Sequence, residues 1–183
     1  MHYEIVDFLI DIVQNSCEAG SRFIGVALDE DEAYVSVRVS DDGKGMDADQ
    51  LRRALDPFVT DGRKHPGRKV GLGLPFLKQA TDQDGGEFFI SSEKGRGTEV
   101  AFRFDRKNVD CPPLGDVPGM LFTILCLPGA HEMTISRKRG GSSYELKKSE
   151  LTEALGNLEE VSSLALLKQY LRSQEEGVDL WQG

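Results

Sequence analysis

Apolar and polar residues alternate with two different periods near the start of the chain, and each period predicts a different element. Over residues 3–19, apolar residues recur at steps of three and four, which predicts an amphipathic helix that ends at Gly20. Over 33–40, valines alternate with polar residues, which predicts a strand with one buried face. Another strand is expected over 22–28, joined to it by the acidic turn 29–32. The helical stripe consists of Ile5, Phe8, Leu9, Ile12 and Val13.

The same signals predict four further elements before residue 105. Asp47 is the expected N-cap of a short helix. The glycine-containing turn 93–97 is expected to join two strands into a hairpin. Residues 56–72 lack periodicity and hold glycines, prolines and basic side chains, which predicts a mobile basic loop. The expected elements are helices over 47–55 and 73–81 and strands over 87–92 and 98–104.

The second part of the chain is organised differently. Prolines and glycines in 106–119 predict a connector, and a leucine stripe over 149–175, broken near Gly156, predicts helices. Because a leucine stripe is usually core, this part is expected to extend the sheet and cover it, in preference to forming a docking face for a partner. We therefore expect two units, 1–105 and 106–183. The strands expected in the second unit are 120–127, 133–137 and 144–146.

Charge and composition exclude several classes of protein. The net charge of −9 argues against a broad nucleic-acid surface, because phosphate binding needs clustered Lys and Arg. No apolar run approaches the roughly 18 residues that span a bilayer, and no signal peptide is visible. The three cysteines share no metal-like spacing and are expected to be reduced cytosolic thiols. Composition therefore favours a cytoplasmic protein with neither a membrane nor a nucleic acid as partner.

Asp11 and Asn15 lie four residues apart, so they share one face of the first predicted helix, with Glu18 near the same face. A carboxylate and a carboxamide at this spacing can hold a hydrated Mg²⁺ and polarise a water or a hydroxyl. Taken alone, the pair is also consistent with a solvated helix edge.

A glycine-bearing segment, 40–46, directly follows the alternating strand and contains Asp41, Gly43, Gly45 and Met46. A carboxylate at a strand end can accept a hydrogen bond from an exocyclic amine such as that of adenine. The glycines let a flat ring approach the backbone. An ordinary Asp-Gly turn is the alternative interpretation.

Gly71, Leu72, Gly73 and Leu74 form another glycine segment, between the basic loop and a predicted helix. Glycine amides at a helix N-terminus can bind phosphate oxygens, although short glycine motifs are weak singly. Thr98 ends a further glycine segment in the predicted hairpin turn, from which it is expected to reach toward Asp41.

Taken in order, these segments resemble the boxes of the gyrase, Hsp-ninety, histidine kinase and MutL (GHKL) ATPases. Residues 11–19 resemble the N box, 41–45 the DxGxG of the G1 box, 56–60 the F box of histidine kinases, 71–74 the G2 box and 95–98 the G3 box. Five motifs in the family's order make the resemblance specific, and it covers residues 1 to about 105. It implies an α+β fold of the Bergerat type, a two-layer sandwich of a mixed sheet with helices on one face. ATP would lie between the helices and a flexible lid.

The resemblance also implies residue roles. Asn15 is expected to bind Mg²⁺, and Asp41 to recognise adenine with support from Thr98. The basic loop at about 58–72 is expected to be a lid that is open without nucleotide and closes on the phosphates of ATP. The residues expected to contact ATP are Asn15, Asp41, Gly43, Gly45, Met46, Lys64, Gly71, Leu72, Gly73, Leu74 and Thr98.

The chain departs from the family's kinases in two respects that concern catalysis. No helical hairpin with a phosphoacceptor histidine precedes the N box in these 183 residues. Glu18 stands where those kinases often have a lysine, which makes the N box more like that of MutL or gyrase. Those ATPases carry a glutamate base where this chain has Asp11, shorter by one methylene, so a slow catalytic step is expected.

Three functions are consistent with these residues. The first is a Mg-ATP-binding regulatory protein, either a weak ATPase or a protein kinase acting on a separate phosphoacceptor protein in trans. The second is a non-catalytic ATP- or ADP-sensing switch that binds a partner protein. The third is part of a larger machine such as a mismatch-repair ATPase, which the acidic charge and the lack of a transducer-like second domain disfavour.

Overall fold

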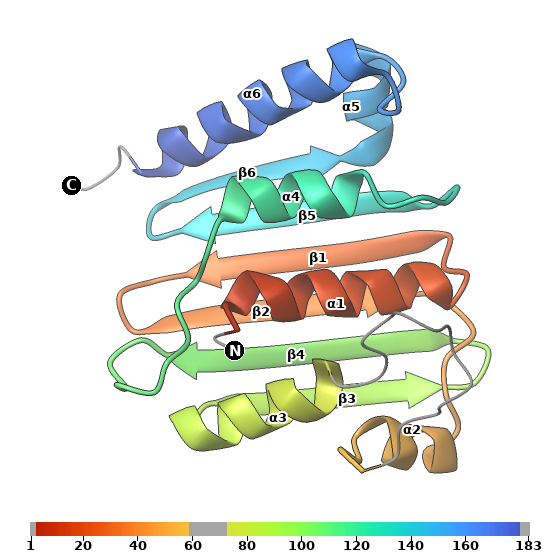
Figure 1. Ribbon diagram of the computed structural model, residues 1–183, viewed down its shortest axis with the longest axis vertical. Coiled ribbons are helices and arrows are strands. Elements are labelled where there is room, and N and C mark those ends of the chain that lie inside the picture. The colour runs from red at the N-terminus through yellow and green to blue at the C-terminus, as the bar shows by residue number, and fades with distance from the viewer. Residues whose placement is uncertain (1–2, 59–72, 180–183) are drawn as a thin grey trace.

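The computed structural model describes residues 3–58 and 73–179 as a two-layer fold, in which α1, α3, α4 and α6 cover one face of a sheet (Figure 1). Within these residues the sheet has six strands in the order β3-β4-β2-β1-β5-β6. The β1–β5 pair is parallel and the other four pairs are antiparallel, so the sheet is mixed. The predicted α+β sandwich is therefore confirmed. The strands are β1 (Phe23–Glu30), β2 (Tyr34–Asp41), β3 (Glu87–Glu93), β4 (Gly97–Asp105), β5 (Glu132–Arg139) and β6 (Ser142–Lys147); the helices are α1 (Ile5–Glu18), α2 (Ala48–Ala54), α3 (Gly73–Asp84), α4 (Val117–Leu125), α5 (Lys148–Leu155) and α6 (Val161–Asp179).

Helix α1 lies at the centre of the helical layer and packs against β2, α3 and α4. Its predicted apolar stripe is buried. A capping box starts the helix, in which the Glu4 side chain accepts from the Asp7 amide and the Glu4 amide donates to Asp7. The amides of Ile5 and Val6 donate to carbonyl oxygens of the connector that follows β4, at 2.9 and 3.1 Å. The connector is therefore tied to the start of the helix that carries Asp11 and Asn15.

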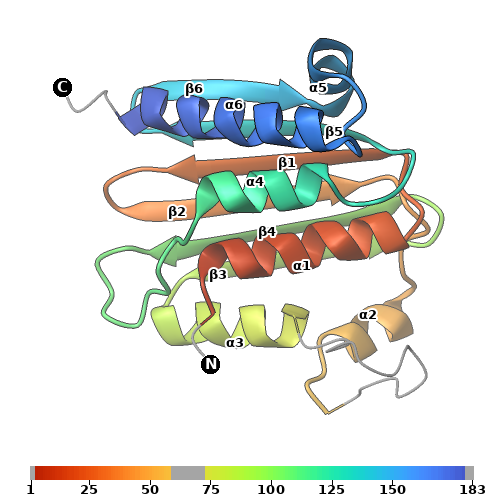
Figure 2. The ribbon, with the colours of Figure 1, turned by 45° about the horizontal axis from the view of Figure 1, so that its top comes forward.

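The strands beyond residue 105 continue the sheet. Strand β5 pairs with β1 over its whole length, from Phe23 beside Glu132 to Glu30 beside Arg139. Helix α4 packs against both α1 and α6, and one hydrophobic core holds residues from either side of residue 105. Figure 2 shows the helices of both parts side by side over the same sheet. No helix in residues 3–58 and 73–179 is long and apolar enough to cross a bilayer.

The prediction of a strand over 120–127 is wrong, because these residues lie mainly in α4. A short apolar run does not distinguish a buried strand from a buried helix by periodicity. The start of the helix shows what distinguishes them here. Asp116 is the N-cap and accepts from the Gly119 amide at 3.0 Å, and Pro118 occupies the first turn, where no amide is needed. By the same capping logic Asp47 was expected to start α2, and this is confirmed.

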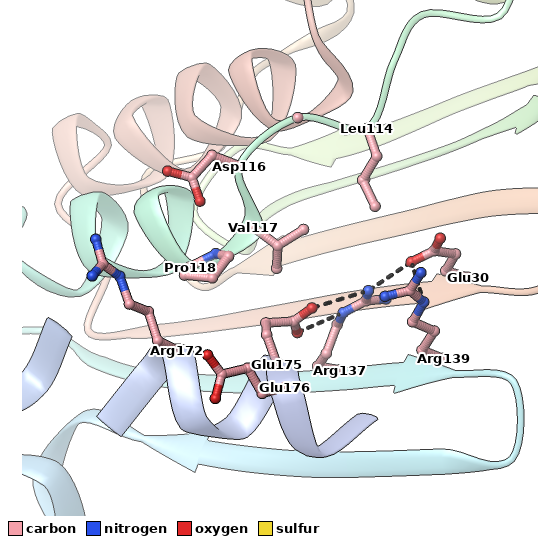
Figure 3. Close-up of a pocket in the computed structure, with 11 residues that line it drawn as sticks. Glu30, Leu114, Asp116, Val117, Pro118, Arg137, Arg139, Arg172, Glu175 and Glu176 are labelled. Carbon is pink, nitrogen blue, oxygen red and sulfur yellow. Dashed lines mark hydrogen bonds and ion pairs between the residues drawn. The ribbon is translucent and has the colours of Figure 1, made fainter. Parts of the chain in front are cut away.

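A buried ion-pair network joins β1, β5 and α6 at the edge of the helical layer (Figure 3). The Arg137 side chain is 1% exposed and donates to Glu175 at 3.0 Å and to Glu30 at 2.6 Å. Burial opposes the charge of Arg137, but hydrogen bonds with Glu175 and Glu30 outweigh it, so the pKa of the guanidinium is raised. The Tyr144 hydroxyl also donates to Glu175, at 2.5 Å, and burial together with this bond raises the pKa of Tyr144. Glu175 is therefore the acceptor through which α6 bonds to β5 and β6.

The network forms one wall of an open pocket of about 420 Å³ between the ends of β1 and β5, the start of α4 and the last turns of α6 (Figure 3). Acidic and basic side chains both line the pocket, which leaves it without one dominant sign of charge. The charged lining residues are Glu30, Asp116, Arg137, Arg139, Arg172, Glu175 and Glu176.

Replacing Glu175 with alanine is expected to lower the free energy of unfolding by about 3–5 kcal/mol, because it leaves a buried guanidinium with one carboxylate fewer. Chemical denaturation monitored by circular dichroism measures the loss. Glu93→Ala is the matched control, because it removes an exposed ion pair with Arg96 whose side chains are 77% and 64% exposed. That control should change stability little. Equal losses in the two variants would contradict the role given to Glu175.

Candidate nucleotide-binding site

Asp41, the last residue of β2, is held by two donors from different parts of the fold. The Ser16 hydroxyl on α1 donates to Oδ2 at 2.7 Å. The Gly43 amide in the following loop donates to Oδ1 at 2.9 Å. Since an ionised carboxylate accepts at about four lone-pair positions, acceptor capacity remains for a ligand. The site therefore presents a fixed carboxylate at a strand end, partly exposed to solvent.

Ser16 was not singled out in the sequence, although it stands between Asn15 and Cys17 on the first helix. Its side chain points to the sheet and is 3% exposed. The bond to Asp41 crosses 25 residues of sequence. The signal that favours it is a small hydroxyl residue on the buried side of the helix that carries Asn15.

The two glycines of the G1 segment pack against the protein's own chain. A Cβ at Gly43 would lie 2.6 Å from the Ser21 hydroxyl, and one at Gly45 would overlap the carbonyl of Glu93. Gly45 also has a φ of +60°, which favours glycine. The structure thus gives both glycines a packing function, and the approach of a base to them stays a prediction.

The β3–β4 hairpin secures the other side of the G1 segment. The Met46 amide donates to the Ser92 hydroxyl at 2.8 Å. Ser92 also donates to the carbonyl of Gly97 at 3.1 Å and lies 2.8 Å from the Thr98 hydroxyl. Thr98 is the direct neighbour of Asp41 across the β2–β4 pair, while its hydroxyl contacts Ser92. Ser92 is a second residue that the sequence did not indicate.

Asp11 and Asn15 are both exposed on α1, one turn apart. Asp11 approaches the first residue of α3, because a Cβ at Gly73 would lie 3.1 Å from Asp11 Oδ2. Surrounding protein atoms desolvate the Asp11 carboxyl and raise its pKa, and the negative charge of Asp7 raises it further. Leu74 packs against the core. The fold therefore brings the carboxylate of Asp11 to the start of the helix that follows the predicted lid.

Several predicted site residues lie outside the described part of the chain. They are Lys64, Gly71 and Leu72, and with them 59–72 of the predicted lid. Among residues 3–58 and 73–179, no group of three or more His, Cys, Asp or Glu side chains is arranged to hold a metal ion. Asn15 makes no side-chain hydrogen bond to another residue in those ranges, so its carboxamide oxygen is available to a ligand.

Comparisons with known proteins agree with this geometry. Residues 4–108 match the family described as histidine kinase-, DNA gyrase B-, and HSP90-like ATPase, which is more than half of the chain. Sporulation kinase E of Bacillus subtilis is 33% identical over 100 residues, which are 52% of this chain and 13% of that protein. A putative sensor protein of Shewanella frigidimarina is 32% identical over 99 residues, 52% of this chain and 15% of that protein. The chain thus matches less than a fifth of either relative's length.

A likeness of fold extends beyond the matched family region. The crystal structure of an N-terminal domain of a DNA repair protein covers 85% of this chain and 57% of its own, with a TM-score of 0.52 and 12% identity. At that identity the likeness concerns the fold alone. The chain belongs to the histidine kinase-, DNA gyrase B- and HSP90-like ATPase family, and residues 4–108 are its ATP-binding domain of the histidine-kinase type.

Proposed function

We propose that this protein binds Mg-ATP and directs its γ-phosphate to a nucleophile activated by Asp11, as a slow ATPase or as a protein kinase acting on a partner in trans. The observation that carries the proposal is the approach of Asp11 to Gly73 at the start of α3, one helical turn from Asn15. A helix N-terminus attracts phosphate, so a carboxylate beside it lies next to the expected phosphate position. The nucleophile is water in an ATPase and a side chain of the partner in a kinase.

In this proposal Asp41 accepts a hydrogen bond from the exocyclic amine of adenine. Its two oxygens are already oriented by Ser16 and Gly43, which supports a role as a fixed acceptor. Gly45 and Met46 follow in the loop that the hairpin secures and border the base. Thr98 borders the same strand end from β4.

Asn15 is the proposed ligand of Mg²⁺. Mg²⁺ is bound through oxygen atoms, and it usually keeps several waters and takes phosphate oxygens of the nucleotide instead of requiring an all-protein cage. A single exposed carboxamide oxygen on α1 fits that preference. Gly73 and Leu74 would hold the phosphates from the described part of α3. Lys64, Gly71 and Leu72 would do so from the segment outside it.

Asp11 is the proposed general base. Its raised pKa makes it a stronger base than an ordinary aspartate, which favours proton abstraction near neutral pH. The shorter side chain relative to a glutamate is expected to keep the rate low. In a kinase, a phosphoacceptor on a separate protein is favoured over His131, the one histidine in residues 3–58 and 73–179. The His131 side chain is only 6% exposed, so a phosphate has little access to it, and burial and the charge of Lys148 lower its pKa.

A non-catalytic nucleotide switch is the alternative proposal. It is favoured by the aspartate at the base position, which leaves ATP binding intact while weakening catalysis. In a switch, ATP or ADP would change the protein's affinity for a partner through the order of a segment near the phosphates.

Replacing Asp41 with asparagine is expected to weaken ATP binding at least about tenfold, because the acceptor for the base amine loses its charge. Isothermal titration with Mg-ATP measures the affinity, and circular dichroism checks the fold. The matched control is Asp42→Asn. The neighbouring carboxylate accepts from the amides of Arg22 and Phe23 at the start of β1, and its replacement should leave ATP affinity unchanged. Unchanged affinity in Asp41→Asn would refute the assignment of the base site.

Replacing Asp11 with asparagine is expected to slow phosphate release or transfer from γ-labelled ATP by roughly 10²–10⁴-fold, while the Kd for ATP stays within about threefold. The assay uses the purified protein alone and with cell lysate. Asp82→Asn serves as the control, because this exposed carboxylate lies near the far end of α3 and pairs with Lys78.

The wild-type result identifies the activity. Released phosphate indicates hydrolysis, and a labelled protein in the lysate indicates transfer. If the wild type binds ATP and does neither, catalysis is excluded and the switch is the remaining proposal.

A further inference from the structure

Ser16 stands in an unusual bonding situation for a serine inside a helix. Such a hydroxyl commonly bonds to the carbonyl one turn back on its own helix. Here it instead donates across the layers to Asp41 Oδ2 at 2.7 Å. An ionised carboxylate has only acceptors, so the hydroxyl hydrogen is committed to it. Ser16 is 3% exposed, so water has little access to this hydrogen bond and does not readily replace it.

The bond restrains the rotation of the Asp41 carboxylate. Gly43 holds one oxygen from the loop, and Ser16 holds the other from the helix. The terminal torsion of an aspartate is broad and roughly two-fold when unrestrained. Because the two donors bind different oxygens, both bonds form in only one orientation of the Asp41 carboxylate. That orientation also fixes the direction of the lone pairs that remain for a ligand.

The backbone around Ser16 fixes where its hydroxyl lies. The Ser21 hydroxyl donates to the Ser16 carbonyl at 2.7 Å. A Cβ at Gly43 would lie 2.6 Å from that Ser21 hydroxyl. The Lys44 amide donates to the Ala19 carbonyl at 3.0 Å. The last turn of α1 and the G1 segment therefore interlock, and Ser16 cannot shift without moving both.

We infer that Ser16 is a positioning residue that makes the site selective for nucleotides whose base carries an exocyclic amine. This rests on the proposed role of Asp41. A fixed carboxylate accepts from an amine and repels a carbonyl oxygen in the same place. A carboxylate free to rotate can turn its lone pairs away, which weakens the bond to the amine and relieves the repulsion of the carbonyl.

The test compares binding of Mg-ATP and of Mg-inosine triphosphate, whose base has a carbonyl where adenine has the amine, by isothermal titration. The wild type should prefer ATP. Ser16→Ala should weaken ATP binding about tenfold and inosine triphosphate binding little or not at all, so the preference falls about tenfold. The ratio of the two constants in one variant does not depend on the fraction of protein folded. Ser16→Thr, which keeps a hydroxyl, should restore the preference.

Ser163→Ala is the matched control, because Ser163 is as buried as Ser16 and its hydroxyl donates to the Leu155 carbonyl, away from the candidate site. It should keep the wild-type preference. An unchanged preference in Ser16→Ala, or an equal loss for both nucleotides, overturns the role of Ser16 while leaving Asp41 in place. A wild type that binds both nucleotides equally overturns the base-reading role of Asp41, and the role of Ser16 with it.

Discussion

The hydrogen bond between Ser16 and Asp41 is the interaction on which the candidate site depends, because it connects the two layers of the fold. Asp41 belongs to the sheet and Ser16 to the helix above it, and each element is fixed by its own buried apolar side chains. Asn15 precedes Ser16 on the same turn. The residue next to the proposed metal ligand thus bonds directly to the proposed base acceptor, although 26 positions separate Asn15 from Asp41 in the sequence.

The residues beyond 105 stabilise the same arrangement from the other side. Strand β5 completes the hydrogen bonding of β1, and α4 packs against α1, so the helix that carries Asp11 is enclosed between α3 and α4. At the last turn of α1 the Cys17 thiol lies 3.8 Å from His131 Nε2, which in turn lies 3.3 Å from Lys148 Nζ at the start of α5. Contacts from both parts of the chain therefore meet within one turn, at Ser16 and Cys17. A division of the chain at residue 105 into two units would cut through a shared core, and it stays a prediction.

Much of the fold was predictable from periodicity, and much of the candidate site was not. The stripe of α1 and the alternation of β2 specify which faces are buried, and capping by Asp47 specifies where α2 begins. The apolar run of α4 shows no period that distinguishes a helix from a strand, so this segment was wrongly predicted to be a strand. The bonds of Ser16 to Asp41 and of Met46 to Ser92 join residues 25 and 46 positions apart. Such pairs depend on strand register and on helix position over the sheet, which no local pattern contains.

The position of Asp11 gives a physical reason for a metal in the proposed site. Its carboxylate lies at the start of α3, where the helix would otherwise attract an anion. A triphosphate brought to the same place meets that carboxylate, and like charges at short range oppose its binding. A helix N-terminus contributes only about 0.3–1 kcal/mol at an exposed position, so it offers little to set against that repulsion. A divalent cation held at Asn15, one turn along α1, would lie near both negative groups and offset their repulsion. A dependence of ATP binding on Mg²⁺ is thus expected from the presence of Asp11 beside the proposed phosphate position, and not from Asn15 alone.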